Sequence, residues 1–566
     1  MSSPIVVGIN RTQDASICAM DAEAVRFSVQ KERLTRVKHA WGRRGDLKSI
    51  YRPRLPQLAD PVDLVVECYS SDPQVKYLAE YRAELEECLR FREAPRVVEV
   101  SHHLAHAYGS FFPAGFSRAA VMVVDFQGSP VSRFTEGFPR EVAVSEAAVF
   151  RGAEDPVEVA SYYLGDGRSL ECLDKQLWNR SAGELGGLGF FFYQTTQCLF
   201  PGAGREGILM GLASYGDPDA LGLPPLEVRG GRVIIPRPWS DLWAAPWPFR
   251  FFIDGQGRFE DCAHLAAAAQ RAFEEALVEQ ARWLRQKTGA EALVYTGGCA
   301  LNCAANARLV REAGYRSVYI PPAPHDGGTA LGCALYGLVE ELGVTPGWRW
   351  AVDFLGPEPE LEPALAVLDE DPEVDLWRPE DWVETVTAAL ARGEVVALFQ
   401  GGSESGPRAL GHRSLLADPR YRAMTDFINR EVKERQWFRP LAPVVTERSQ
   451  GEIFELHRPS PFMQLAVSVR PPYRDRIPAA VHADGTARLQ TVTAEHHPLL
   501  FALLESFGRR TGLEVLLNTS FNGPGEPIVE TLQEAVDFFL QRPVHLLAVP
   551  PYLIRKRREV PHPLRT

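Results

Sequence analysis

Short apolar runs alternate with helix-patterned segments in two blocks of the 566-residue chain, and this alternation limits the fold more than any other feature. In the first block, apolar runs such as 5–9 and 119–124 are followed by helical patterns such as 329–342. In the second block, the helical pattern at 499–511 is followed by an apolar run at 513–518. Strands that alternate with helices are typical of mixed sheets covered by helices. The sequence therefore predicts an α/β fold.

A Pro- and acid-rich segment separates the two blocks. It contains Gly356-Pro-Glu-Pro-Glu and Asp369-Glu-Asp-Pro, and such clusters of Pro mark breaks between helices and strands. A chain of this length usually holds more than one domain. We therefore predict a first domain at 1–345, a linker region at 346–381 and a second domain at 382–566. The sequence shows no internal repeat.

The charge balance opposes a polyanionic partner. The chain carries 61 Lys and Arg against 73 Asp and Glu, for a net charge of -12, which is a poor match to a nucleic-acid backbone. No apolar run is long enough to predict a membrane-spanning helix, and a signal-peptide pattern is lacking. The nine cysteines are scattered without a C-x-x-C pair, as in proteins with reduced thiols. We expect a cytoplasmic protein without a nucleic-acid or membrane partner, and the oligomeric state is left open.

Two histidines and two aspartates form the first candidate site. His102 and His106 are four residues apart, so a helix would place both imidazoles on one face, where they can bind one metal ion. This spacing alone is also found in pairs of core or surface histidines. Asp125 follows an apolar run and Asp326 precedes two glycines, and both positions lie just after a predicted strand, where α/β proteins build sites. Together the four residues predict a site for a borderline divalent ion such as Fe, Mn or Zn.

Glycine pairs and polar turns in the first block suggest contacts to a phosphate. Gly297-Gly298 and Gly327-Gly328 follow predicted strands, where glycine lets backbone N–H groups approach a phosphate. Asn302 and Asn306 follow at helical spacing and fit either a ligand contact or a helix cap. Asp14 lies in a polar turn between two predicted strands, where actin-like ATPase folds hold phosphate, which is an analogy at the level of the fold.

The second block concentrates cations and amides in Gly-rich runs. Arginine offers a planar fork of donors that fits phosphate oxygens. Ser520 and Asn522 alternate, so on an extended strand they face the same side. A single arginine is usually a solvated surface charge, but several such runs in one domain of an acidic chain indicate an anion site. The runs are 406–414, 433–440, 482–488 and 518–522.

With these motifs the chain resembles the bacterial O-carbamoyltransferases of the nodulation-protein and antibiotic-tailoring type. The matching motifs occur in the order of that family over nearly the whole chain. They are His102-His-Leu-Ala-His106, Val124-Asp125, Glu206–Gly216, Gly297–Asn302, Pro324–Gly328, Gly406–Gly411, Phe438–Pro443, His482–Arg488 and Asn518–Gly523.

The resemblance implies both a fold and a reaction. The N-terminal domain would be Kae1-like, with an actin-like ATPase (ASKHA) architecture, and the C-terminal domain would be YrdC-like. The C-terminal domain would convert carbamoyl phosphate and Mg-ATP to carbamoyl-adenylate. The N-terminal domain would then transfer the carbamoyl group to a hydroxyl of a small acceptor, which we expect to be a natural product in antibiotic biosynthesis.

The resemblance also implies roles for individual residues. Fe2+ is the expected ion, with Mn2+ or Zn2+ as alternatives, and its ligands would be His102, His106, Asp125 and Asp326. Carbamoyl phosphate and ATP would contact Arg408, Lys433, Arg439, His482, Arg488, Ser520 and Asn522. The expected catalytic residues are Lys38, His39, Arg408 and Arg488. In the N-terminal domain the adenylate would contact Asp14, Gly297, Gly298, Asn302 and Gly327.

Two departures from the family pattern leave alternatives open. Gln13 stands where many relatives have His, and Ile208 stands where relatives often have Lys. Gln13 removes a proton acceptor, which is the one feature that favours a non-catalytic nucleotide- and metal-binding paralogue. A threonylcarbamoyl-adenylate-type tRNA modification enzyme is the other alternative, and the acidic charge opposes it. The aromatic runs 190–193 and 241–249 fit either an apolar acceptor cleft or core packing.

Overall fold

The computed structural model describes residues 3–69, 78–136, 156–180, 185–244 and 257–564. The chain forms two compact units. Unit 1 contains Met1–Thr35 and His39–Trp350, and unit 2 contains Arg36–Lys38 and Ala351–Thr566. Both units combine mixed sheets with helices, which confirms the α/β prediction. Within the described part of the chain, every helix is too short or too polar to cross a bilayer.

Unit 1 contains two five-stranded sheets that share one strand order. The first is ordered β3-β2-β1-β4-β5 and the second β8-β7-β6-β11-β12. In each sheet the first three strands are antiparallel and the last two run parallel to the central strand. The two sheets therefore share the same strand order and the same strand directions. The strands are β1 (Val6–Asn10), β2 (Ser16–Met20), β3 (Val25–Gln30), β4 (Leu64–Tyr69), β5 (Val97–Ser101), β6 (Ala119–Val124), β7 (Val157–Gly165), β8 (Leu170–Trp178), β11 (Ala292–Thr296) and β12 (Ser317–Tyr319).

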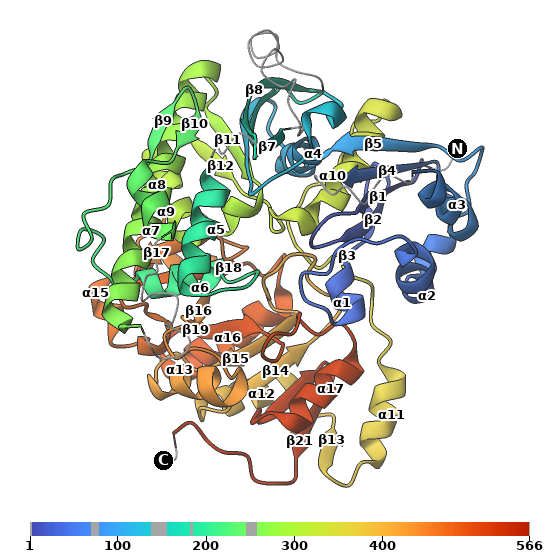
Figure 1. Cartoon of the computed structure of the whole chain (residues 1–566). Coiled ribbons are helices and arrows are strands. Elements are labelled where there is room, and N and C mark those ends of the chain that lie inside the picture. The colour runs from blue at the N-terminus through green and yellow to red at the C-terminus, as the bar shows by residue number, and fades with distance from the viewer. Residues whose placement is uncertain (1–2, 70–77, 137–155, 181–184, 245–256, 565–566) are drawn as a thin grey trace. The chain divides into compact units, whose positions relative to one another are not determined.

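Two helices connect the sheets of unit 1. α4 (His102–Ala114) follows the first sheet but packs on β6, β7 and β11 of the second, whereas α10 (Thr329–Tyr336) follows the second sheet and packs on β1, β2 and β4 of the first. The two helices also pack against each other (Figure 1). Only glycine permits so close an approach, because a Cβ on Gly332 would lie 1.8 Å from the Ala105 carbonyl oxygen. This packing brings the start of α4 next to the turn that precedes α10.

The remaining helices of unit 1 surround this core. The longest is α8 (Phe259–Thr288), which has 30 residues and packs against α5, α6 and α9. A two-stranded sheet, β9 (Glu227–Arg229) with β10 (Arg232–Ile234), also contacts it. The other helices are α1 (Lys31–Thr35), α2 (Arg52–Arg54), α3 (Leu78–Cys88), α5 (Leu188–Leu199), α6 (Glu206–Ala213), α7 (Arg237–Ala244) and α9 (Cys303–Glu312).

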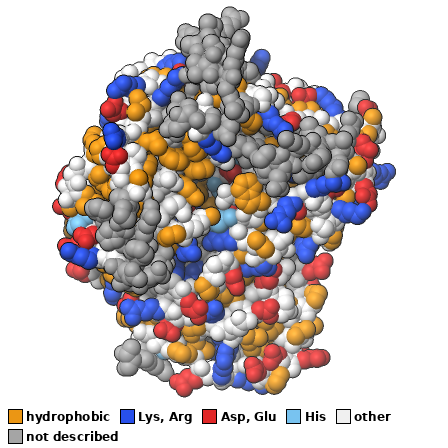
Figure 2. All heavy atoms as spheres, viewed as in Figure 1, with side chains coloured by type: hydrophobic (Ala, Val, Ile, Leu, Met, Phe, Trp, Pro, Cys, Tyr) orange, Lys and Arg blue, Asp and Glu red, His pale blue; other side chains and the backbone are white. Residues whose placement is uncertain are grey.

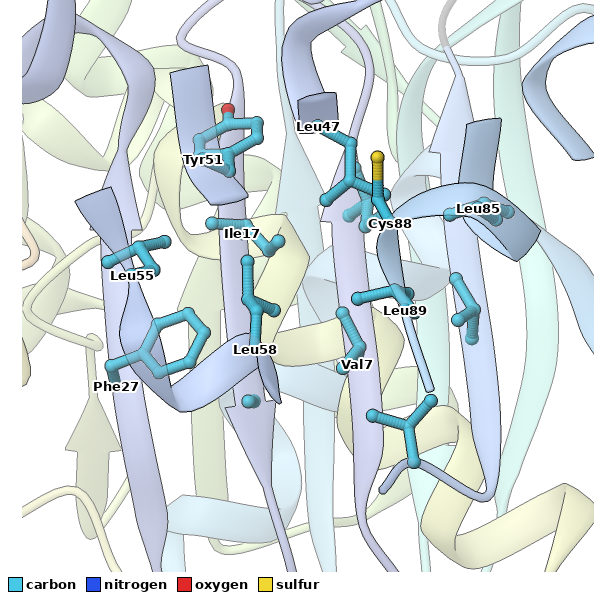
Figure 3. Close-up of a cluster of buried hydrophobic side chains, with 14 of the residues drawn as sticks. Val7, Ile17, Phe27, Leu47, Tyr51, Leu55, Leu58, Leu85, Cys88 and Leu89 are labelled. Atoms are coloured by element: carbon cyan, nitrogen blue, oxygen red, sulfur yellow. The ribbon is translucent and has the colours of Figure 1, made fainter. Parts of the chain in front are cut away.

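A hydrophobic cluster covers the first sheet of unit 1 (Figure 3). Val7, Ile17 and Phe27 project from β1, β2 and β3, and all three are fully buried. Side chains such as Leu55 and Leu85, from the segment after β3 and from α3, cover them. Burial of apolar area is the main favourable contribution to folding, so this cluster stabilises the sheet whose strand ends carry Asn10 and Ser101.

Unit 2 contains a nine-stranded mixed sheet, ordered β13-β21-β20-β14-β15-β19-β16-β18-β17. β14 is parallel to β20 and β16 to β18, and the other neighbours are antiparallel. Helices α12 and α16 pack together, and α16 lies against β16 and β19 (Figure 1). The strands are β13 (Val374–Trp377), β14 (Val396–Phe399), β15 (Arg413–Ala417), β16 (Ala442–Thr446), β17 (Leu465–Ser468), β18 (Thr486–Val492), β19 (Val515–Ser520), β20 (Leu546–Val549) and β21 (Tyr552–Lys556). The helices are α11 (Glu362–Glu370), α12 (Trp382–Ala391), α13 (Ala423–Phe427), α14 (Glu447–Ile453), α15 (Pro471–Arg474), α16 (Pro498–Thr511) and α17 (Leu532–Gln541).

Unit 2 also draws on residues outside 382–566. α11 and β13 lie in the segment 346–381, and β13 pairs with β21. Arg36 belongs to unit 2 as well, because its guanidinium donates hydrogen bonds to the carbonyl oxygens of Ile528, at 2.7 Å, and Pro527, at 2.8 Å. The folded unit is therefore assembled from both sides of the domain boundary that the sequence predicts.

We expect Val7→Ala to destabilise unit 1 by about 2 kcal/mol, since it removes two buried methyl groups and leaves a cavity. The matched control is Val367→Ala, because Val367 is 63% exposed whereas Val7 is 0% exposed. The control should change the free energy of unfolding by less than about 0.5 kcal/mol. Urea unfolding of both variants measures the difference, and equal effects would contradict this account of the core.

Candidate functional site

The structure brings together the four residues predicted to bind a metal. His102 and His106 lie one turn apart on α4, which confirms that their spacing is helical. Asp125 directly follows β6, and Asp326 begins the 3-10 turn Asp326–Gly328 before α10. One donor atom from each of the four residues lies within 4.8 Å of the other three. We call this group the His/Asp quartet.

The donor atoms of the quartet point at one another. The Nε2 atoms of His102 and His106 are 3.2 Å apart. His106 Nε2 lies 3.2 Å from Asp125 Oδ2, and His102 Nε2 lies 3.3 Å from Asp326 Oδ1. His102 and His106 are 0% and 3% exposed. The two imidazoles and two carboxylates therefore converge on one buried point.

The second oxygen of each carboxylate is held by a different partner. The Phe126 backbone N–H donates to Asp125 Oδ1 at 2.7 Å, and the Thr12 hydroxyl donates to Asp326 Oδ2 at 3.1 Å. Asp125 Oδ2 is buried and makes no hydrogen bond of good geometry within the described residues. Each aspartate thus presents its other oxygen to the imidazoles, which is an arrangement that fits a shared ion.

The charges of the quartet also fit a divalent cation. Burial would raise the pKa of Asp326, but the neighbouring imidazoles lower it to about 2. Burial would lower the pKa of His102, but attraction to Asp326 and contact with Asp125 raise it well above its usual value. Burial would also raise the pKa of Asp125, but contact with His102 and His106 lowers it well below its usual value, so both carboxylates are ionised near neutral pH. Two imidazole nitrogens and two carboxylate oxygens are a donor set that suits Fe, Mn or Zn.

A buried ion pair on strands β7 and β8 supports the start of α4. Glu158 Oε1 accepts hydrogen bonds from the backbone N–H groups of His103 and Ser129, both at 3.0 Å. The other oxygen of Glu158 lies 2.5 Å from Lys175 Nζ, and both side chains are 0% exposed. Ser129 Oγ in turn accepts from the His102 N–H at 2.9 Å. This network fixes the helix end that carries the imidazoles, and sequence motifs did not reveal it.

The residues predicted to contact an adenylate in unit 1 have mixed positions. Gly298 lies against the quartet, since a Cβ there would come 2.8 Å from Asp125 Oδ1, and Gly297 packs on Val124. Gly327 is next to Asp326 in the 3-10 turn. Asn302 instead caps α9, where its side chain accepts from the Ala305 N–H at 3.1 Å and also pairs with Gln270. Asp14 hydrogen-bonds to His39.

In unit 2, the structure brings Lys433, Ser520 and Asn522 together. Lys433 Nζ lies 3.1 Å from Ser520 Oγ and 2.6 Å from Asn522 Oδ1, and the Ser520 hydroxyl donates to Asn522 Oδ1 at 2.6 Å. Lys433 is 4% exposed. Burial lowers the pKa of Lys433 well below its usual value, and repulsion by Arg435, Lys38 and other cations adds to this effect. Glu526 opposes it only weakly.

Arg435 is part of the same cation pocket; it lies in the predicted anion run 433–440 but was not among the individual residues expected to contact carbamoyl phosphate and ATP. Burial, with repulsion by Arg439 and Arg488, lowers the pKa of the Arg435 guanidinium well below its usual value. Its Nε donates to Asn429 Oδ1 at 2.7 Å, whereas its Nη2 is buried without a hydrogen bond to any described residue. The signal in the sequence was its place two residues after Lys433. Lys433, Arg435, Arg439 and Arg488 are called the cation pocket below.

The other predicted residues of unit 2 lie on neighbouring loops and strands. His482 hydrogen-bonds to Thr486 through Nδ1 at 3.1 Å, and burial lowers its pKa to about 4. Arg408 lies half-buried on the loop between β14 and β15. The next residue of that loop is tied to β19, because Asn518 Nδ2 donates to the Ala409 carbonyl oxygen at 3.2 Å. The role of Arg408 in the pocket stays a prediction.

In the cation pocket Lys433 is buried, whereas Arg435, Arg439 and Arg488 are half-buried. On the face shown in Figure 2, basic and acidic side chains are interspersed. Lys38 is exposed and groups with unit 2, whereas His39 is partly buried and groups with unit 1.

In unit 1, Phe126 lies next to Asp125, and its ring packs on Phe190 and Tyr193, with centroids 6.4 Å and 5.0 Å away. Of the run 241–249, residues 245–249 lie outside the described part of the chain.

These features define a two-unit α/β protein with the His/Asp quartet in one unit and a cluster of cations around the buried Lys433 in the other. The family described as Carbamoyltransferase C-terminus matches residues 387–556, and that described as Carbamoyltransferase N-terminus matches residues 250–335. Nodulation protein NolO of Bradyrhizobium diazoefficiens is 34% identical over 81% of this chain and 79% of its own length. The chain belongs to the O-carbamoyltransferase family, a family of enzymes.

Other relatives are consistent with this membership. Nodulation protein NolNO of Sinorhizobium fredii is 34% identical over 82% of this chain, and the match spans 65% of that protein's length. The 3'-hydroxymethylcephem-O-carbamoyltransferase of Streptomyces clavuligerus is 33% identical over 63% of this chain and 67% of its own. The solved structure of T. kodakarensis HypF has a TM-score of 0.37 at 12% identity, over 60% of this chain and 48% of that one. A likeness at that TM-score carries no argument about fold or function.

We expect His106→Ala to weaken the binding of one divalent ion by at least about 10-fold, because the quartet loses one of its donors. Competition with a chromophoric chelator, with Zn2+ and Fe2+ tested separately, measures the affinity. His264→Ala is the matched control, since His264 lies on α8 away from the quartet residues. Equal affinity in His106→Ala and the wild type would show that the quartet does not hold the ion.

We expect the affinity of the cation pocket for sulfate to fall as pH rises. Sulfate keeps both charges at neutral and alkaline pH, so only the protein titrates. The pKa of Lys433 is lowered, so its ammonium loses its proton, and with it the attraction for the anion, as pH rises through that lowered value. Isothermal titration calorimetry measures the affinity. Lys433→Met should bind sulfate more weakly and with a flatter pH dependence, whereas Lys48→Met, at an exposed site, should match the wild type. An affinity that rises with pH would contradict this account.

Proposed function

We propose that the chain is an ATP-dependent O-carbamoyltransferase in which the two units divide the reaction. Unit 2 would form carbamoyl-adenylate from carbamoyl phosphate and ATP, and unit 1 would pass the carbamoyl group to a hydroxyl of a small molecule. The observation that carries this proposal is the cation pocket, in which the buried Lys433 is held by Ser520 and Asn522 and is repelled by the half-buried Arg435 and by other cations. Buried charge without a counter-charge is costly, so the pocket is built for an anionic ligand.

The pocket supplies what the first reaction needs. Carbamoyl phosphate and ATP are both anionic, and bond changes at their phosphorus atoms move negative charge onto oxygens. Cations held in place before the reaction stabilise such charge without having to reorganise. Lys433 would act as a point charge, and its contacts with Ser520 and Asn522 fix its direction. Arg435, Arg439 and Arg488 would hold phosphate oxygens through their planar forks.

The His/Asp quartet supplies what the transfer reaction needs. His102, His106, Asp125 and Asp326 would hold a divalent ion, with Fe2+ first among the candidates. When bound, such an ion stabilises negative charge on the adenylate phosphate as AMP departs. Gly298 lies beside Asp125, so its backbone N–H would contact the same phosphate, whereas the Gly297 N–H donates to the Pro324 carbonyl oxygen at 2.9 Å. The doubled sheet order of unit 1 supports the Kae1-like assignment, and we propose a YrdC-like assignment for unit 2.

The acceptor is proposed to be a small hydroxylated natural product, as in a cytoplasmic pathway of antibiotic biosynthesis. The Streptomyces clavuligerus relative is a 3'-hydroxymethylcephem-O-carbamoyltransferase. In this chain, Phe126, Phe190 and Tyr193 are partly buried and pack together next to Asp125. Aromatic rings beside a site are suited to a partly apolar ligand. This cluster therefore favours an acceptor with an apolar face.

We expect pyrophosphate release from ATP to require carbamoyl phosphate, because the pocket must bind both anions. Arg488→Ala should lower this release by at least about 10-fold, since one hydrogen-bonded cation is lost from the pocket. His106→Ala should leave pyrophosphate release unchanged and should lower AMP release, because the quartet lies in unit 1. A coupled pyrophosphate assay and chromatography of AMP measure the two reactions.

The comparison between variants makes this test specific. Arg378→Ala, in the stretch between β13 and α12, is the control for Arg488→Ala. Pyrophosphate release that is independent of carbamoyl phosphate would refute adenylate formation. Equal loss of both products in His106→Ala would refute the division of labour between the units. A screen of hydroxylated metabolites with labelled carbamoyl phosphate then identifies the acceptor.

A further inference from the structure

The loop between β14 and β15 is buried except at its tip. Of residues 402–411, Pro407 and Arg408 are half-buried, whereas the others are buried. Backbone N–H and C=O groups that are removed from water need hydrogen-bond partners. In this loop, side chains supply several of these partners, so the position of Arg408 depends on the residues that hold the loop on either side of it.

Glu404 holds the part of the loop that follows Arg408. Its Oε1 atom accepts hydrogen bonds from the backbone N–H groups of Leu410, at 2.7 Å, His412, at 3.0 Å, and Arg413, at 3.3 Å. Glu404 is 1% exposed. Burial would raise its pKa, but attraction to His412 and the hydrogen bonds from the backbone lower it. An ionised oxygen therefore receives three N–H groups, and hydrogen bonds to a charged acceptor are roughly twice as strong as neutral ones.

Asp353 holds the part of the loop that precedes Arg408. Its Oδ1 accepts from the Ser405 hydroxyl at 2.5 Å, and its Oδ2 accepts from the Gly406 N–H at 2.8 Å. The Ser405 N–H donates to the Asp353 carbonyl oxygen at 3.0 Å. Asp353 is 1% exposed. Arg408 therefore lies between two stretches of backbone, and each of them is fixed by a buried carboxylate.

Two amide side chains tie the same loop to the strands that carry Ser520 and Arg488. Asn518 Nδ2 and Gln490 Nε2 donate to carbonyl oxygens of the loop, at 3.2 Å and 2.8 Å. Asn518 Nδ2 also donates to Gln490 Oε1 at 2.8 Å, so both amides lie on one face of the sheet. Asn518 lies two residues before Ser520 on β19, and Gln490 lies two residues after Arg488 on β18. Residues two apart on a strand point to the same face. The loop of Arg408 therefore lies on the face from which Ser520 and Arg488 project.

We propose that Glu404 is a positioning residue that, by fixing the loop, holds Arg408 ready to contact the anion bound in unit 2. This inference rests on the proposed function. Glu404 acts through the loop and not on the ligand, because its Oε1 already receives three N–H groups and its Oε2 is buried. Ordering a flexible loop on binding costs conformational entropy. A loop that is fixed beforehand leaves only the side chain of Arg408 to be ordered, so it favours tighter anion binding.

A double-mutant cycle on Glu404 and Arg408 tests this role, with sulfate affinity measured by isothermal titration calorimetry. We expect Arg408→Ala to weaken sulfate binding by at least about 10-fold, because a charge-assisted contact is lost. Glu404→Met should weaken it by a similar factor, and Glu404→Gln by less, since an amide oxygen can still accept from the loop. The double variant Glu404→Met/Arg408→Ala should match Arg408→Ala within about 2-fold, because Glu404 acts only through Arg408. Glu380→Met, at an exposed site in unit 2, should match the wild type.

Each other outcome overturns the proposal or the function on which it rests. Losses that add in the double variant would show that Glu404 supports the unit as a whole and not Arg408. Urea unfolding shows whether Glu404→Met is folded, and if it is not, the same cycle with Glu404→Gln decides in its place. Unchanged sulfate affinity in folded Glu404→Met, or in Arg408→Ala, would refute the role of the loop. Wild-type pyrophosphate release without carbamoyl phosphate would refute the proposed function, whereas the sulfate cycle would still decide the role of Glu404.

Discussion

Charge removed from water must be neutralised, and the two units meet this constraint in different ways. In unit 1, the buried carboxylates of Asp125 and Asp326 face the imidazoles of His102 and His106, and Lys175 faces Glu158. In unit 2, Lys433 and Arg435 contact amide, hydroxyl and carbonyl oxygens and repel each other. Leaving cations without a counter-charge costs stability. In the proposed function, an anionic ligand would supply the missing counter-charge in unit 2, and a divalent ion would be held by the acceptor atoms of the quartet.

Hydrogen bonds from neighbouring residues determine how precisely the side chains of the two sites are held. In unit 1, the Thr12 hydroxyl and the Phe126 N–H each fix one carboxylate oxygen, so the other oxygen has a defined direction. In unit 2, Asn429 Nδ2 donates to the carbonyl oxygens of Trp437, at 3.1 Å, and Arg439, at 2.8 Å, while its Oδ1 holds Arg435. Side chains that are supported in this way keep their positions whether or not a ligand is bound. Both sites are therefore preorganised.

The sequence predicted the helices and strands that carry the site residues, because these follow from local residue patterns. It missed contacts that arise only when distant segments of the chain pair in the fold. The helical spacing of His102 and His106 and the apolar run before Asp125 placed three quartet residues on the correct elements. Lys175 and Glu158 have no motif, because their contact arises from the pairing of β7 with β8. The two sheets of unit 1 share an order without a sequence repeat, since backbone hydrogen bonds and an apolar face suffice to specify a strand. Arg435 was not singled out within the run 433–440, because the sequence does not reveal its contact with Asn429.

Gln13, which departs from the family pattern, lies in a turn whose backbone is held by the side chain of Asn10. Asn10 bonds the carbonyl oxygen of Gln13, at 3.2 Å, as well as that of Asp14, so the turn is fixed through its backbone whatever side chain stands at position 13. The positive φ at Asp14 directs that carboxylate to His39. The contact between Asp14 and His39 therefore does not depend on the side chain at position 13. The departure at position 13 therefore leaves intact the contacts of Asn10 with the turn and with the Asp326 carbonyl oxygen.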